Sequence, residues 1–137
     1  IMPFDTQSAA TISSQVGRVE ELLFQHMGGS YTDMVRTPGG ATGGLVKSTV
    51  PAPIITWSVD TLDWKGLSAS EIAARVLGNV KNGSIVLMHN NGEHTLEALP
   101  LVLEGLKNKG FDCVKIGDLI YRENYTIDHT GRQIRST

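Results

Sequence analysis

Three polar residues follow short runs of apolar or β-branched residues, at points where strands are expected to end. They are Arg36, Asp60 and His89. Because the carboxyl ends of parallel strands open on one face of a sheet, we expect the three side chains to gather there. Each alone would more simply be a surface ion pair, a helix cap or a residue at the rim of the sheet. Together they predict a functional site.

An imidazole, a carboxylate and a guanidinium in one place could support the hydrolysis of an acyl group. Histidine gives or takes a proton near neutral pH, and the carboxylate of Asp60 could orient the ring of His89. The guanidinium of Arg36 could hold a second carboxylate through two hydrogen bonds. Backbone N–H groups of Gly39 and Gly40 could stabilise a developing oxyanion. These residues include no evident nucleophile or base.

The glycine-rich stretch 35–44, VRTPGGATGG, also raises the question of phosphate binding. Gly39 and Gly44 have the spacing of the two glycines of a P-loop, but Leu45 stands where the lysine is required. No G-x-G-x-x-G triple occurs either. An unrelated nucleotide-binding α/β domain remains an alternative, which a thermal shift with ATP or NAD would reveal.

The four histidines do not form a recognisable metal-binding motif. His89 and His94 are five residues apart with Glu93 between them, which is not the H-E-x-x-H pattern of a helix-borne zinc site. His26 lies in the last turn of a predicted helix, where it suits the helix dipole, and His129 lies in the polar end of the chain. We expect no complete metal site from the residues of this chain.

Composition excludes several classes of protein. The chain has 137 residues, of which 40% are hydrophobic and 19% charged, as in an ordinary globular domain. The formal net charge of −2 and the lack of a basic patch argue against nucleic-acid binding. No apolar run is long enough for a membrane span. The single cysteine, Cys113, lies in an apolar run and is expected to be a small buried core residue.

Helical and strand patterns alternate along the chain and predict an α/β fold with a parallel sheet, either open or part of a barrel. The predicted helices cover residues 6–29, 68–80 and 95–110, and the predicted strands cover 32–36, 52–60, 83–89 and 111–117. Ser68 and Glu71 fit a capping box. The inward residues are expected to be Ile12, Val16, Val19, Leu23 and Met27 in the first helix, and Leu96, Leu99, Leu103 and Leu106 in the third. The polar end, 118–137, is expected to form a surface tail or hairpin.

Three segments resemble successive motifs of one family. The segments RTPGG (36–40), WSVDTLDW (57–64) and IVLMH (85–89) resemble motifs of the polysaccharide deacetylases, which share the NodB-homology domain of carbohydrate esterase family 4. The order agrees, and the likeness extends over most of the region 1–121, leaving 122–137 as a polar C-terminal tail. The resemblance implies a distorted (β/α) barrel and a divalent metal, usually zinc. It also implies hydrolysis of N-acetyl groups of amino sugars or O-acetyl groups of xylan.

The resemblance also implies roles for single residues. Arg36 would hold the catalytic-base aspartate, Asp60 would orient His89, and His89 would be the general acid for the leaving amine. The N–H of Gly39 would help to bind the acetyl oxygen. Trp64 and Leu87 would wall the pocket for the acetyl methyl group, although Trp64 could instead pack in the core.

The chain departs from the family pattern in one large respect. The first two family motifs, which resemble T-F-D-D-G and H-S-x-x-H and supply the base and the metal ligands, are not found in this sequence. The chain therefore resembles the C-terminal two-thirds of the domain. We expect the metal to be bound mainly by residues outside this chain, on an N-terminal segment of the same domain present as a separate polypeptide. This chain alone would then be inactive.

Peptidoglycan N-acetylglucosamine is the expected substrate, ahead of chitin oligomers and acetylxylan, and the implied location is extracellular or on a bacterial cell surface. The alternative is a metal-free relative that binds glycans without catalysis.

Overall fold

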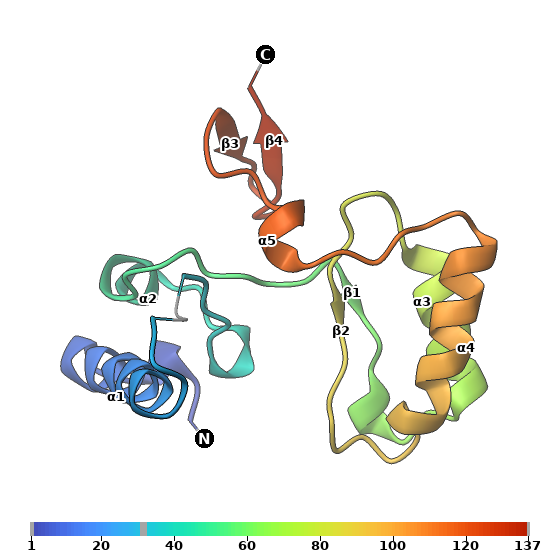
Figure 1. Ribbon diagram of the computed structural model, residues 1–137, viewed down its shortest axis with the longest axis horizontal. Helices are drawn as coiled ribbons and strands as arrows, with labels where there is room; N and C mark the ends of the chain where they lie inside the picture. The colour runs from blue at the N-terminus through green and yellow to red at the C-terminus, as the bar shows by residue number, and fades with distance from the viewer. Residues whose placement is uncertain (1, 31–32, 137) are drawn as a thin grey trace. The chain divides into compact units, whose positions relative to one another are not determined.

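The computed structural model describes residues 2–30 and 33–136. The chain forms two compact units, Ile1–Thr56 and Trp57–Thr137, which we call unit 1 and unit 2. Figure 1 shows the elements of both, and each unit is described by itself.

Unit 1 is built around the helix α1, Ala9–Met27. Its start is fixed by Ser8, whose side chain accepts a hydrogen bond from the N–H of Thr11, and its end by Gly28, whose φ of 75° suits glycine. The helix predicted from the apolar spacing is thus confirmed. The unit also contains the short helices η1 (Phe4–Thr6), η2 (Pro38–Gly40) and α2 (Gly44–Thr49).

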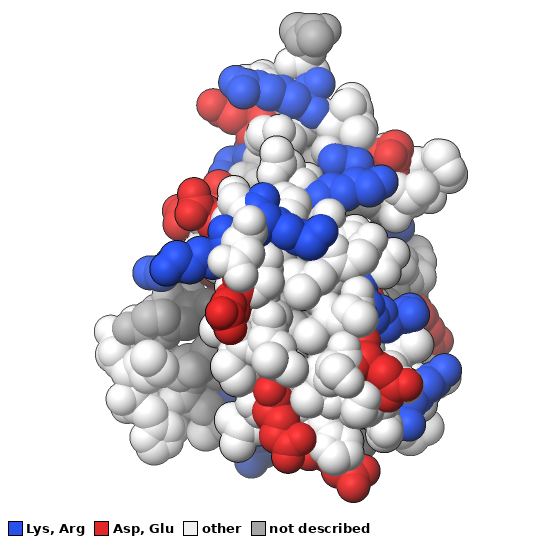
Figure 2. All heavy atoms as spheres, turned by 90° about the vertical axis from the view of Figure 1, so that its right-hand side faces the viewer, with Lys and Arg blue, Asp and Glu red and all other residues white. Residues whose placement is uncertain are grey.

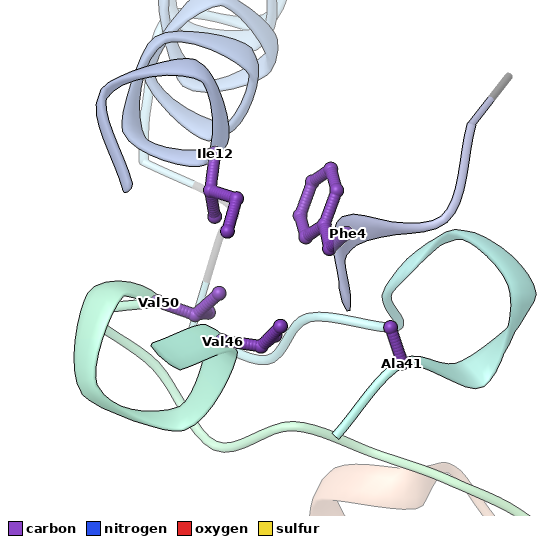
Figure 3. Packing of buried hydrophobic residues seen from close by; sticks show 5 residues of the cluster. All are labelled: Phe4, Ile12, Ala41, Val46 and Val50. Atoms are coloured by element: carbon purple, nitrogen blue, oxygen red, sulfur yellow. The ribbon is translucent and has the colours of Figure 1, made fainter. Parts of the chain in front are cut away.

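The core of unit 1 is a small cluster that joins η1, α1, the chain after η2, and α2 with its C-cap. It consists of Phe4, Ile12, Ala41, Val46 and Val50 (Figure 3). Of the predicted inward residues of α1, Ile12 is fully buried, whereas Val19 is 52% exposed and Met27 57% exposed. Val16 and Leu23 are partly buried, so Ile12 is the one fully buried residue of the five predicted inward positions.

Unit 2 contains a parallel strand pair and two packed helices. Strand β1 (Val59–Asp60) pairs in parallel with β2 (Val86–Leu87). The helix between them, α3 (Ala69–Asn79), packs on α4 (Thr95–Asn108). This arrangement agrees with the predicted α/β class. The Ser68–Glu71 capping box at the start of α3 is present as predicted.

The inward face of α4 differs from the prediction. Its buried residues are Ala98, Val102 and Leu106, whereas Leu96, Leu99 and Leu103 are exposed. Gly105 explains the choice of face, because a Cβ at this position would overlap the side chain of Leu77 on α3. Val102 and Leu106 pack with residues of α3 on this face, and of the four predicted leucines only Leu106 is buried. Figure 2 views the molecule from the side on which α4 lies in Figure 1, and uncharged surface is exposed there between acidic and basic side chains.

Three of the predicted strands are shorter than expected, since 83–89 contains only β2 (Val86–Leu87), and the fourth is wrong. Residues 32–36 and 52–60 meet in a parallel bridge between Val35 and Ile54; residue 32 lies outside the described part. Residues 111–115 have no regular structure, and α5 (Ile116–Leu119) follows them. Cys113 is exposed there instead of buried, because no strand pairs with this segment in the described structure.

The C-terminal region forms the hairpin that was one of the two predicted outcomes. Strands β3 (Tyr125–Ile127) and β4 (Gln133–Arg135) pair in antiparallel register around a turn near Gly131, whose φ is 85°. Among the residues that the structure describes, no helix is long and apolar enough to cross a membrane.

Candidate catalytic site

Asp63 lies in the loop that leaves β1, at the start of the short helix η3 (Asp63–Lys65). Just before it, Leu62 takes the left-handed conformation with φ 55°, and its N–H donates to Oδ1 of Asp60 at 3.0 Å. This turn redirects the chain after β1, and the side chain of Asp63 is fully buried. A fully buried carboxylate requires hydrogen-bond donors around it.

His89 supplies two of those donors. It lies two residues beyond the end of β2, beside the loop that follows β1. Its Nδ1 is 2.7 Å from Oδ1 of Asp63, and its backbone N–H donates to Oδ2 of Asp63 at 2.7 Å. The hydroxyl of Thr95, the first residue of α4, donates to the same Oδ2 at 2.7 Å. The side chain of His89 remains 36% exposed, so the pair joins a buried carboxylate to an accessible imidazole.

These contacts settle the charge of Asp63. Burial raises the pKa of its carboxyl, but the hydrogen bonds from the side chain and backbone of His89 and from Thr95 outweigh burial. They lower the pKa from 3.8 to about 2. Asp63 is therefore ionised at neutral pH and accepts the proton that His89 carries on Nδ1.

The carboxylate paired with His89 is thus Asp63 and not the predicted Asp60. The side chain of Asp60 accepts from the N–H of Leu62, and its carbonyl oxygen accepts from Nε of Arg75 at 2.7 Å. Both aspartates belong to the segment DTLDW, so the sequence placed the carboxylate in the correct loop. The turn at Leu62 decides which of the two faces the histidine, and a φ above zero at leucine is not visible in sequence patterns.

Trp64 and Leu87 flank this pair along the chain. Leu87, on β2, is 7% exposed, whereas Trp64, directly after Asp63, is 60% exposed. Within the described structure Trp64 therefore does not pack in a core, which was the alternative to a pocket role. The ammonium group of Lys65 lies 5.0 Å from the centre of the Trp64 ring. The ring of Trp64 is therefore solvent-exposed, directly after Asp63 in the chain.

The other predicted site residues belong to unit 1. Arg36 is exposed and follows Val35, which forms the bridge to Ile54. Gly39 and Gly40 have φ values of 66° and 72°, a conformation that suits glycine. The N–H of Gly40 donates to the carbonyl oxygen of Thr37 at 3.0 Å, so the tight turn already uses this donor. Of the predicted site residues, Asp60, Trp64, Leu87 and His89 lie together in unit 2, whereas Arg36, Gly39 and Gly40 belong to unit 1.

The Asp63–His89 pair can orient an imidazole and stabilise its charged form. With Nδ1 bonded to Asp63, Nε2 is the nitrogen left for a ligand, and it makes no hydrogen bond to any residue that the structure describes. A histidine held in this way can donate a proton from Nε2 to a leaving group or take one from a nucleophile.

The described residues do not form a metal site. Over 2–30 and 33–136, no group of three His, Cys, Asp or Glu side chains lies close enough together to hold a metal ion. The two ion pairs of His94, with Glu93 at 4.0 Å and Glu97 at 3.2 Å, are exposed and make only a local cluster.

Comparison with known proteins adds a relative and two solved structures. The chain is 36% identical over 113 residues to the peptidoglycan-N-acetylglucosamine deacetylase PgdA of Listeria monocytogenes serotype 1/2a. This match covers 82% of the chain and 24% of the relative. The crystal structure of the Bc1960 peptidoglycan N-acetylglucosamine deacetylase matches 86% of the chain with a TM-score of 0.79 and 30% identity. The match covers 58% of that protein.

A third protein is described as a mutant, with restored activity, of the pseudoenzyme BA3943 of the CE4 family. It matches 83% of the chain, and 42% of its own length is covered, with a TM-score of 0.75 and 28% identity. No protein-family model matches the chain. The chain thus spans about a quarter of the length of the Listeria relative and somewhat more than half of the Bc1960 structure.

Proposed function

Because the chain belongs to the polysaccharide deacetylases of carbohydrate esterase family 4, we propose that it is part of an enzyme that hydrolyses acetyl groups of an N-acetylated polysaccharide. The likeness to solved deacetylase domains also confirms the predicted fold, part of a NodB-type α/β domain. Peptidoglycan N-acetylglucosamine is the substrate that we propose first, since that sugar appears in the names of the Listeria relative and the Bc1960 structure.

The Asp63–His89 pair is the observation that carries this proposal. Hydrolysis of an acetamide joins the oxygen of water to the acetyl carbon, breaks the carbon–nitrogen bond and leaves the nitrogen in need of a proton. A charged His89 can supply that proton from Nε2. Meanwhile, Asp63 accepts a hydrogen bond from the N–H at Nδ1 and balances the positive charge of the ring. Because Asp63 stays ionised well below neutral pH, this support is present throughout the physiological range.

The remaining site residues complete the proposal as roles that the family resemblance implies. Trp64 and Leu87 would wall the pocket of the acetyl methyl group, next to the catalytic pair. Arg36 would hold the aspartate that acts as base, and the N–H of Gly39 would bind the acetyl oxygen. The φ of 66° at Gly39 favours glycine at this position, so a larger residue there would be strained.

A divalent metal, with zinc as the first candidate, belongs to the proposed enzyme. When bound, it would polarise the acetyl oxygen. Since the described residues form no metal site, its ligands would come mainly from the two motifs that the sequence does not contain. An N-terminal segment of the same domain, as a separate chain, would supply them. Mass spectrometry of the purified protein tests this, and a folded, active monomer of this chain alone would contradict it.

The proposed substrate sets the proposed location. Peptidoglycan lies outside the bacterial membrane, so the complete protein is expected to act extracellularly or on the cell surface.

A second function is a glycan-binding protein without catalysis. We retain this alternative because BA3943, a pseudoenzyme whose mutant has restored activity, shares the fold. Metal analysis and an acetate assay on the complete protein with N-acetylglucosamine oligomers distinguish the two. An enzyme binds the metal and releases acetate, whereas a binding protein retains the oligomer and releases none.

A further inference from the structure

Among the described residues, three hydrogen-bond donors reach the carboxylate of Asp63, and two of them belong to His89. The ring of His89 bonds Oδ1, and its backbone N–H bonds Oδ2. Both contacts come from the residue that Asp63 is expected to orient. The third donor, the hydroxyl of Thr95 at 2.7 Å from Oδ2, comes from a different element, the first turn of α4. Thr95 is thus the contact that ties the carboxylate to the helix.

Gly92 leaves the space that this contact needs. A Cβ at position 92 would overlap Oγ1 of Thr95 and would lie 3.1 Å from Oδ2 of Asp63 and 3.3 Å from its Cγ. The φ of Gly92 is not in the left-handed region, so the restriction there is one of room and not of backbone conformation. The carbonyl of Gly92 also accepts the N–H of Thr95 at 3.3 Å, which sets the start of α4 against the carboxylate.

We propose that Thr95 is a positioning residue for His89, acting through Asp63, and that Gly92 keeps open the space in which the Thr95 hydroxyl reaches the carboxylate. A carboxylate that loses one donor in a buried setting turns toward other donors or takes up water. Either change moves Oδ1 away from Nδ1 and releases the ring. The role in catalysis rests on the proposed deacetylase function, whereas the role in holding the ring does not.

The test compares Thr95→Val, which keeps the shape and removes the hydroxyl, with Thr95→Ser, which keeps the hydroxyl, in the complete protein. If the energy of a hydrogen bond to a charged group is lost in full from the transition state, the rate falls by about 10- to 100-fold. Thr95→Val should lower kcat by about this factor and leave KM within about 2-fold, and Thr95→Ser should stay near wild type. Thr126→Val, the same substitution on the exposed strand β3, is the matched control. If Thr95→Val does not fold, Thr95→Ala takes its place.

A second readout does not depend on turnover. In ¹⁵N-labelled protein, the ring nitrogen shifts of His89 should report a proton held on Nδ1 in the wild type and in Thr95→Ser. This population should fall in Thr95→Val and in Gly92→Ala. If the wild type releases no acetate but the ring shifts change as expected, the proposed function fails and the positioning role stands. Unchanged ring shifts and kcat in Thr95→Val, or an effect on KM alone, would overturn the positioning role.

Discussion

Asp63 and His89 form a direct pair in which Oδ1 of the buried carboxylate lies 2.7 Å from Nδ1 of the accessible imidazole. The two residues are 26 positions apart in sequence, and the parallel pairing of β1 with β2 brings their loops together. The ring is held through one nitrogen and leaves the other for a ligand. The proposed chemistry depends on this geometry.

The first prediction concerns Asp63 and its neighbour Asp60. In the complete protein, Asp63→Asn should lower kcat by about 10²- to 10⁴-fold, because the amide cannot balance the ring charge and can present an N–H to the ring. Asp60→Asn is the matched control, since its amide oxygen can still accept the N–H of Leu62. Steady-state acetate release measures both variants. A larger loss with Asp60→Asn than with Asp63→Asn would restore the role first predicted for Asp60.

The second prediction follows from the pKa of Asp63. A carboxyl whose pKa is lower in the folded than in the unfolded protein stabilises the fold above the unfolded value of 3.8. That stability is lost as the pH falls toward about 2. The lowered pKa corresponds to about 2 kcal/mol. Between pH 5 and pH 2, the free energy of unfolding measured with urea should fall by about 2 kcal/mol more for the wild type than for Asp63→Asn. Equal losses would mean that the carboxylate is not held as described.

The third prediction tests the contact between α3 and α4. Gly105→Ala should destabilise the protein by about 1 to 3 kcal/mol, because the new methyl group would overlap Leu77. Gly78→Ala, on α3, is the control, since a Cβ there meets nothing within 4 Å. Alanine favours the helix, so this variant should gain up to about 1 kcal/mol. Thermal unfolding compares the two, and a stabilised Gly105→Ala variant would show that the helices pack less closely than described.

Local signals in the sequence predicted the helices well. The capping box of Ser68 and Glu71 and the glycine after α1 are short-range features, and the structure contains both. On α4 the prediction was right for Leu106 but wrong for Leu96, Leu99 and Leu103, because the leucines form the more conspicuous stripe in the sequence. The contact with α3 instead uses Val102 and Leu106, beside Gly105, whose missing Cβ leaves room for Leu77.

The site was predictable as a region and not atom by atom. His89 was identified from its place after an apolar strand, and the structure places it two residues beyond the end of β2 with a carboxylate partner. Which aspartate pairs with it depends on the left-handed turn at Leu62, a backbone conformation that the residue type leucine does not predict. Strand 111–117 was predicted from its apolar, strand-like run, but a strand also requires a neighbouring strand to bond, and the described residues supply none.

The central claim is that His89 is the general acid of a polysaccharide deacetylase, and acetate release tests it most directly. The complete protein, loaded with zinc, is incubated with N-acetylglucosamine oligomers, and wild type is compared with His89→Ala. We expect the wild type to release acetate and His89→Ala to be about 10²- to 10⁴-fold slower, with the same zinc content. Acetate release that persists at the wild-type rate in His89→Ala, or zinc lost together with the histidine, would contradict the account.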